Sequence, residues 1–129
     1  MILVLDDVPG VIVTFGVTLR RLGIPFHGAE SIAEAKALLP RHHWTGFVLD
    51  LELPDGNGVE LLEWLRTQPA FCETPAVVIT ANILIDDSLA ARVAGSRASL
   101  HCGAFTRADV EMICRKLLGS PTGDGAQGL

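Results

Sequence analysis

The sequence has few basic residues, few cysteines and no long apolar run, and each shortage excludes a class of protein. Lysine and arginine total 10 against 15 aspartates and glutamates, so the net charge is −5 at pH 7. An acidic domain has little attraction for phosphate backbones, so we expect no direct binding to nucleic acid. The apolar runs fall far short of the roughly 18 residues that a transmembrane helix requires, so we expect no membrane contact.

The three cysteines, Cys72, Cys102 and Cys114, are odd in number and form no C-x-x-C pair. They therefore argue against a disulfide framework and favour free thiols in a reducing compartment. Asp6 and Asp7 interrupt the apolar N-terminus before a secretory leader could form. We therefore expect a cytoplasmic protein.

The composition is that of a globular chain, with 49% hydrophobic and 19% charged residues among 129. A chain of this length buries about two-thirds of its unfolded surface. We expect one domain over residues 1–118. Residues 119–129 (GSPTGDGAQGL) contain no core-forming pattern and are predicted to be a flexible tail or linker.

Short apolar runs alternate with segments of helical periodicity along the whole domain. We expect strands over 1–5, 24–28, 46–50, 76–80 and 98–102, and helices over 9–21, 31–39, 59–67, 87–95 and 108–118. Such alternation predicts a parallel sheet with right-handed crossovers and helices on both faces. The expected fold class is α/β, a flavodoxin-like (βα)5 three-layer sandwich with strand order 2-1-3-4-5.

Segment 9–21 is the hardest to assign, because the run 11–14 consists of residues that prefer strands. Ile12, Phe15 and Leu19 nevertheless recur at helical spacing, and Pro9 suits a first helical turn. We expect a helix with these three side chains inward. The residues expected to face outward beside the acidic site are Val11, Thr14 and Thr18.

Aspartates follow the first and third predicted strands. Asp50 ends the apolar run Phe47–Leu49, and Asp6 and Asp7 follow the first strand. The switch point of the sheet lies between these strands, so the three carboxylates should meet there. Two like charges about 4 Å apart repel by roughly 4 kcal/mol at an effective dielectric of 20. Such a cluster is tolerable only with a cation, a shared proton or wide spacing. Oxygen ligands of this kind suit Mg²⁺, and a carboxylate beside that ion can attack a phosphoryl group.

Four features in register resemble a two-component response-regulator receiver domain, over residues 1 to about 118. They are Asp6-Asp7, Asp50, the loop with Pro54 and Gly58, and Thr80-Ala81. The separations of 43 positions from Asp7 to Asp50 and 30 from Asp50 to Thr80 are those of receivers.

The resemblance implies a signalling domain and not an enzyme. Asp50 would accept a phosphoryl group from a histidine kinase or phosphotransfer protein, and an effector domain or protein would act downstream. Asp7 and Asp50 would hold Mg²⁺, with Asp6 helping through water and the backbone carbonyl of Glu52 as a further ligand. Thr80 would be the switch hydroxyl, and the small Ala81 would leave room for the phosphate.

One departure concerns the lysine that receivers carry after strand five in a Lys-Pro-Phe sequence. Here Gly103-Ala104 precedes Phe105, and the two lysines of the chain, Lys36 and Lys116, are placed too far away. The cationic residues that remain near this position in sequence are Arg97, His101 and Arg107. The aromatic residue usual in strand five is also replaced, by Leu100 or His101.

Two other functions stay open. A pseudo-receiver would keep the fold and the acids as an interaction module, with weak or no switching because Gly103 replaces the lysine. A flavodoxin-like cofactor binder would need a glycine-rich phosphate loop after the first strand. The sequence there is Asp-Asp-Val-Pro-Gly, whose carboxylates would repel an anionic cofactor.

Overall fold

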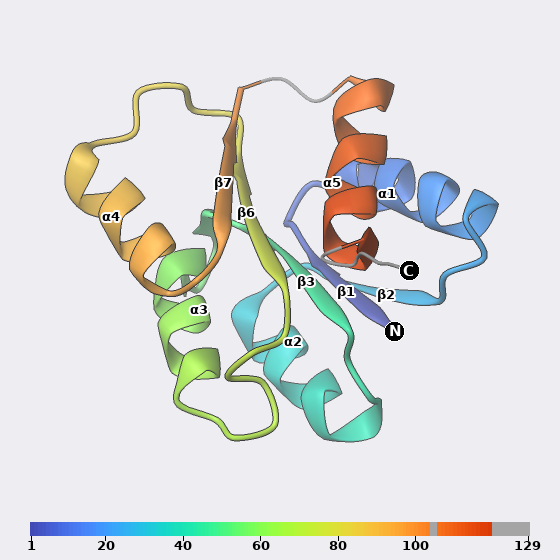
Figure 1. Cartoon of the computed structure of the whole chain (residues 1–129), viewed down its shortest axis with the longest axis horizontal. Coiled ribbons are helices and arrows are strands. Elements are labelled where there is room, and N and C mark those ends of the chain that lie inside the picture. The colour runs from blue at the N-terminus through green and yellow to red at the C-terminus, as the bar shows by residue number, and fades with distance from the viewer. Residues whose placement is uncertain (104–105, 120–129) are drawn as a thin grey trace.

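The computed structural model describes residues 1–103 and 106–119. Strands and helices alternate along these residues (Figure 1). The main strands are β1 (Ile2–Leu5), β2 (Phe26–Ala29), β3 (Gly46–Asp50), β6 (Ala76–Thr80) and β7 (Ser99–Cys102). The helices are α1 (Pro9–Arg21), α2 (Ile32–Leu38), α3 (Gly58–Arg66), α4 (Asp87–Gly95) and α5 (Arg107–Gly119).

Three short elements complete the fold, and none of them was predicted from the sequence. A 3-10 helix, η1 (Leu39–Arg41), follows α2, so the α-helix expected over 31–39 ends at Leu38 and Pro40 lies within the 3-10 turn. The turn after β3 contains a two-stranded ribbon made of β4 (Glu52–Leu53) and β5 (Gly56–Asn57). Of the predicted tail, Gly119 ends α5, and residues 120–129 lie outside the described residues.

The five main strands form one parallel sheet in the order β2-β1-β3-β6-β7. In chain order this is 2-1-3-4-5, so the predicted flavodoxin-like topology is confirmed. Leu5, the last residue of β1, pairs with Ala29 on one side and Leu49 on the other. Residues that directly follow β1 and β3 therefore emerge side by side at the carboxyl edge of the sheet.

The sheet separates two apolar cores, because successive side chains of a strand point to opposite faces. Leu3, Leu5 and Leu49 pack against α2, α3 and α4, whereas Val4 and Val48 pack against α1 and α5. Figure 1 shows the same arrangement, with α1 and α5 on one side of the sheet and the other helices opposite them. The central strands are buried on both faces, which explains their continuous apolar runs.

Polar side chains cap the starts of several helices. Ser31 accepts a hydrogen bond from Glu34 N–H at 3.1 Å, and Asp86 accepts one from Leu89 N–H at 2.7 Å. Thr106 and Asp109 form a reciprocal pair at the start of α5. The sequence Ser31-Ile-Ala-Glu34 has the pattern of a capping box, but the box is incomplete, since the Glu34 carboxylate accepts from Glu30 N–H and not from Ser31 N–H.

The predicted outward face of α1 is partly wrong. Thr18 is only 2% exposed, although Thr14 is exposed as expected. The reason is that α1 packs against two neighbours, the sheet and α5, and therefore buries more than one stripe. Arg21 marks the second contact, since its guanidinium lies 3.8 Å from the Glu111 carboxylate of α5. The exposed apolar residues of α1 include Val13 and Val17.

Arg66, at the end of α3, joins the two loops that precede β6 and β7, at the amino-terminal edge of the sheet. Its guanidinium donates to the carbonyls of Phe71 (2.9 Å) and Thr74 (2.7 Å), and to those of Ser96 (2.7 Å) and Arg97 (3.2 Å). Partial burial lowers the pKa of this side chain, yet four carbonyl acceptors match its planar donors. Arg66 therefore stabilises the structure at the edge opposite to the acids.

Among the described residues, no helix combines the length and the apolar character needed to cross a membrane.

We expect Arg66→Met to lower the free energy of unfolding by about 2–3 kcal/mol, because it leaves several carbonyls without their charged donor. Arg115→Met is the matched control, since Arg115 is 65% exposed and pairs with Glu111 within one helix. The control should change stability by about 0.5 kcal/mol or less. Urea unfolding measures both variants. Equal losses in the two would contradict the structural role of Arg66.

Candidate functional site

Three carboxylates converge at the carboxyl edge of the sheet. Asp6 and Asp7 follow β1, and Asp50 ends the neighbouring β3. One oxygen atom from each lies within 4.8 Å of the other two. Together with Glu52 and Ala81 they line a pocket of about 260 Å³, which we call the acid pocket. The structure thus brings together the three acids that the sequence placed at this edge.

The three acids have different surroundings. Asp6 is 4% exposed and accepts a hydrogen bond from Val8 N–H at 2.8 Å, at the start of α1. Asp50 is partly buried and accepts a long hydrogen bond, 3.4 Å, from Glu52 N–H. Asp7 is exposed. Asp6 is therefore held in place by backbone, whereas Asp50 has weak hydrogen bonding and faces the pocket.

Burial and mutual repulsion both oppose ionisation of these groups. Burial, followed by the charge of Asp6, raises the pKa of Asp50 to about 7. Burial and the charge of Asp7 also raise the pKa of Asp6, against the opposing effect of the Val8 N–H. The pocket therefore holds more negative charge than it can stabilise from its own groups, and a cation would relieve this.

The donor set fits a small divalent cation. All three ligand groups are carboxylates, and Mg²⁺ prefers oxygen ligands at about 2.0–2.1 Å, while retaining several waters. Oxygens bound to one such ion lie roughly 3–4 Å apart by this geometry, so the observed cluster needs little adjustment. A bound Mg²⁺ would supply positive charge beside Asp50 and lower the pKa of that carboxyl group.

The loop after Asp50 is anchored in two ways that the sequence did not reveal. A Cβ atom at Gly58 would overlap the Asp50 carbonyl oxygen, so only glycine lets α3 begin this close to the acid. Asp55 accepts hydrogen bonds from Ile32 N–H and Ala33 N–H, both at 2.9 Å, and these lower its pKa. The loop is thereby tied to the start of α2. Nothing in the local sequence around Asp55 indicates this distant partner.

Thr80 ends β6, and Ala81 follows it. Strand β6 pairs with β3 on the side opposite to β1, so these residues flank Asp50 on the side away from Asp6 and Asp7. Thr80 is 1% exposed, and its hydroxyl accepts a hydrogen bond from Asn82 N–H at 3.1 Å. Ala81 is exposed and lines the acid pocket. The structure therefore places Ala81 directly at the site, whereas the Thr80 hydroxyl is engaged with its own loop.

Gly103 follows β7, at the position where the resemblance to receivers led us to expect lysine. It is buried, has φ of +102°, and donates a hydrogen bond to the Thr80 carbonyl at 2.8 Å. It also lines a second pocket, of about 340 Å³, between α1, α5 and the ends of β6 and β7. We call this the apolar pocket. Ala104 and Phe105, the other residues of the departure, lie outside the described residues.

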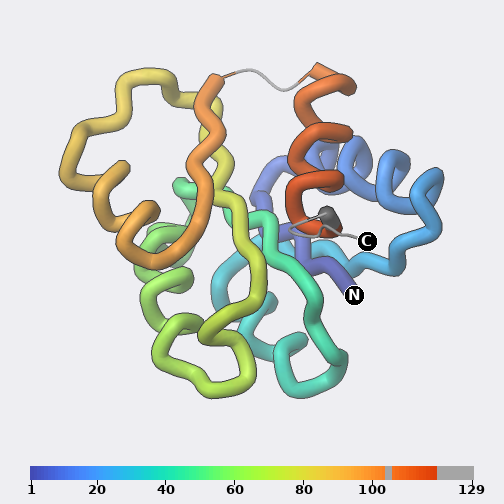
Figure 2. The backbone as a smooth tube through the Cα atoms, in the orientation of Figure 1, coloured from blue at the N-terminus to red at the C-terminus, as the bar shows by residue number. Residues whose placement is uncertain are grey.

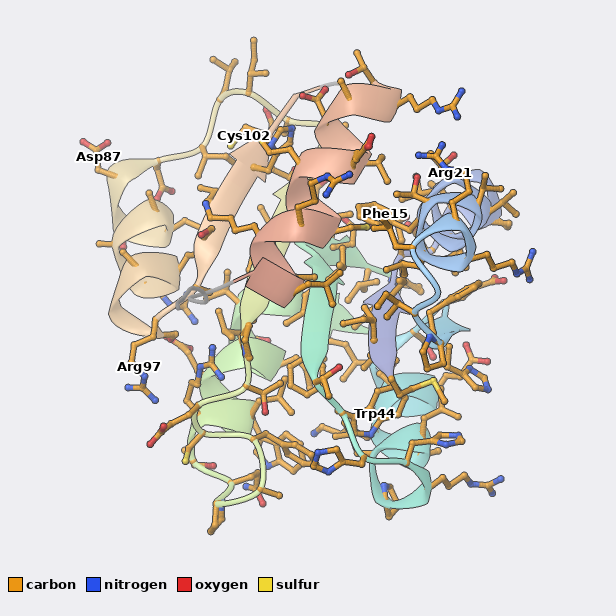
Figure 3. All side chains as sticks on the ribbon, turned by 45° about the vertical axis from the view of Figure 1, so that its right-hand side comes forward. Phe15, Arg21, Trp44, Asp87, Arg97 and Cys102 are labelled. Carbon is orange, nitrogen blue, oxygen red and sulfur yellow. The ribbon has the colours of Figure 1, made fainter. Side chains whose placement is uncertain are left out.

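The cations suggested near this position do not line either pocket. Arg97 precedes β7 and lies at its opposite end from Cys102, as Figure 3 shows. Arg107 is exposed at the start of α5. Hydrogen bonds from Thr106 lower the pKa of Asp109 on α5, and His101 lies close enough to add a smaller electrostatic effect in the same direction. Leu100 packs against the core on the side of α2, α3 and α4. Because successive side chains of a strand point to opposite faces, the two candidate aromatic positions of β7, 100 and 101, face opposite sides of the sheet.

Residues 2–101 match the family model of the response regulator receiver domain. Among curated proteins, the chain is 32% identical over 94 residues to response regulator protein PilR of Pseudomonas aeruginosa, covering 73% of this chain and 21% of PilR. It is 34% identical over 95 residues to the alginate biosynthesis transcriptional regulatory protein AlgB of Pseudomonas putida, covering 74% and 21%. The chain thus spans about a fifth of the length of these relatives.

Solved structures share the fold. A response regulator receiver domain protein from Methanospirillum hungatei superposes with a TM-score of 0.77 at 21% identity, over 90% of this chain and 91% of that one. The phosphorylated cyanobacterial phytochrome response regulator RcpA gives 0.80 at 18% identity, over 94% and 95%. At such low identity these similarities establish the architecture alone.

The raised pKa of Asp50 predicts how stability depends on pH. The Asp50 carboxyl group has a pKa of about 7 in the folded chain and about 4 in the unfolded chain. As pH rises, the unfolded chain therefore releases this proton first. In metal-free buffer the free energy of unfolding should therefore fall between about pH 4 and pH 7. Asp50→Asn should stabilise by about 1–2 kcal/mol above this range, a value reduced for solvent screening, and by little below it.

Urea unfolding at several pH values measures this dependence. Glu73→Gln is the control, because Glu73 is exposed in the loop before β6, at the other edge of the sheet. The control should retain the parental pH slope. If Asp50→Asn left the pH dependence of the free energy of unfolding unchanged, this would contradict the assignment of the raised pKa to Asp50.

Proposed function

The chain belongs to the response regulator receiver domain family of two-component systems, and we propose that it accepts a phosphoryl group on Asp50. The donor would be a histidine kinase or a phosphotransfer protein. The observation that supports this most directly is the position of Asp50, which faces a pocket shared with the clustered carboxylates of Asp6 and Asp7. The boundary of the domain after residue 118 remains a prediction.

The proposed reaction uses the chain's own groups as follows. An ionised Asp50 oxygen attacks phosphorus, forming a P–O bond as the P–N bond to the donor imidazole breaks. The electron pair of that bond leaves with the imidazole nitrogen, which then takes up a proton. Because the pKa of Asp50 is about 7 in the cation-free site, a nearby positive charge is needed to keep the nucleophile ionised.

The proposed metal ligands are Asp7 and Asp50, with Asp6 acting through water and the Glu52 backbone carbonyl completing the set. The bound Mg²⁺ would neutralise charge that develops on the phosphoryl oxygens. The Val8 N–H occupies one oxygen of Asp6, which suits a supporting role better than a direct one. Glu52 N–H orients Asp50.

Thr80 is the proposed switch residue, and Ala81 provides space. The Thr80 oxygen accepts from Asn82 N–H, so the hydroxyl proton remains available to donate to a phosphoryl oxygen. Turning the hydroxyl toward Asp50 would lose the contact with Asn82 and move the loop after β6. Ala81 lines the acid pocket, where a larger side chain would occupy the volume needed by the phosphoryl group.

The relatives support a role in regulation through a further protein or segment. AlgB is named a transcriptional regulatory protein, and this chain matches about a fifth of its length. We propose that an effector, on another protein or elsewhere in a longer chain, reads the surface change. The net charge of −5 does not favour direct contact of this domain with nucleic acid.

Incubation with acetyl phosphate and Mg²⁺ tests phosphorylation. We expect a single phosphoryl adduct on Asp50 by intact-mass and peptide mass spectrometry, and no adduct when a chelator is present throughout the incubation. Asp50→Asn should abolish the adduct, and Asp87→Asn, which changes an exposed acid at the start of α4, should retain it. An adduct that persists in Asp50→Asn, or none in the parent, would contradict the proposal.

Gly103 favours a second candidate, in which the domain binds partners but transmits phosphorylation weakly. Glycine provides no charge to pair with a phosphoryl group, and a charge-assisted hydrogen bond of this kind is worth about 1.5–3 kcal/mol. The hydrogen bond from Gly103 N–H to the Thr80 carbonyl already joins the two strand ends without a phosphoryl group. This candidate differs from the first in the response of β7 and α5.

Amide chemical shifts with beryllofluoride and Mg²⁺ distinguish the two candidates. Weak transmission predicts shifts near Asp50 and Ala81 but little change across β7 and α5. Large changes in those elements would contradict the second candidate and support the relay. Asp50→Asn serves as the control that binds no beryllofluoride at this site.

A further inference from the structure

The apolar pocket opens next to the acid pocket. The two share Val8, Val11 and Ala81 in their linings. Beyond this shared wall, the apolar pocket is lined by Phe15 and Val110 among others. In Figure 3, Phe15 lies between α1 and α5, and this residue lines the pocket. The molecule therefore presents a hollow of about 340 Å³, apolar at its base, with three carboxylates beside it.

Neither pocket is lined by lysine, arginine or histidine in the part of the chain that the structure describes. Residues 104–105 and 120–129 contain none of these residue types in their sequence. Under the proposed function the site keeps an excess of negative charge. Asp6, Asp7, a divalent ion and a dianionic phosphoryl group sum to about two negative charges.

The rim of the hollow is itself apolar and exposed. Val8 is 53% exposed on the α1 side, and Ile83 is 72% exposed in the segment after β6. The Ile83 side chain lies next to Gly103, since a Cβ atom there would be 3.4 Å from its Cγ2. Figure 2 shows that β7 ends at the same end of the molecule as the segment that follows β6. Val8 and Ile83 thus leave apolar surface exposed at the edge of the pocket, which a protein docked there would cover.

We propose that the apolar pocket receives a lysine side chain from a partner protein docked over the acid site. The aliphatic stem would pack on Phe15, Val110 and Gly103, and the ammonium group would reach the carboxylates or, under the proposed function, the phosphoryl group on Asp50. Lysine has this combination of an apolar stem and a charged head. Its compact ammonium group is also a better match than a planar guanidinium for acceptors that converge from two strands.

Binding of n-butylammonium to the metal-free protein, followed by amide chemical shifts, tests the pocket without any phosphorylation. We expect shifts centred on Gly103, Ala81 and Val110. Affinity should exceed that of methylammonium and of n-butanol by about tenfold or more, because only butylammonium uses both burial and charge. Failure of this binding would leave the proposed function standing, since that function is tested separately by adduct formation on Asp50.

The source of the ammonium group is tested with a blocked Gly-Lys-Gly peptide. We expect it to shift the same amides as n-butylammonium. Binding of n-butylammonium without binding of the peptide would overturn the partner lysine in favour of a free amine. An affinity for n-butylammonium no greater than for methylammonium would overturn the pocket itself.

Thr14→Lys tests the location. Thr14 is exposed on α1 and lines the apolar pocket, so a lysine there competes with the ligand. We expect a loss of affinity of about tenfold or more. Val13→Lys adds the same charge one residue away at a position 63% exposed, and should change affinity by no more than about twofold. Equal effects of the two variants would overturn the assignment to this pocket.

Discussion

Repulsion among three carboxylates is the constraint on which the site depends. The sheet register places Asp6 and Asp7 next to Asp50, and the two apolar cores that determine this register are extensive. The acids therefore cannot move apart without disturbing the packing of β1 and β3. The cost appears as raised pKa values at Asp6 and Asp50. Stability gained in the cores thus holds a charge cluster that is unfavourable until a cation neutralises it.

The surroundings of the cluster divide into a rigid side and an open side. On the rigid side, Gly58 lets α3 begin against the Asp50 backbone, and Asp55 ties the same loop to α2. On the open side, Ala81 and Gly103 are small and the neighbouring lining is apolar. The rigid side positions the acceptor, whereas the open side leaves volume for a phosphoryl group and for whatever cation accompanies it.

Most of the fold could be predicted because each element carries its own local signal. Apolar runs of four or five residues marked the strands buried on both faces, and Ser31, Asp86 and Thr106 marked helix starts. The elements that were missed, η1 and the β4–β5 ribbon, are too short to show any periodicity. The error at Thr18 arose because helical periodicity identifies one buried stripe and cannot show that a second helix covers another.

The sequence by itself determined the strand order, the meeting of the three acids and the lack of lysine at Gly103, because these follow from alternation, strand ends and residue identity. Only the tertiary structure decided the hydrogen bonds of Asp55, the second buried face of α1 and the apolar pocket between α1 and α5. Each of these depends on contacts between segments far apart in the chain. Such contacts leave no periodic trace in either segment, so they become visible only once the helices are packed on the sheet.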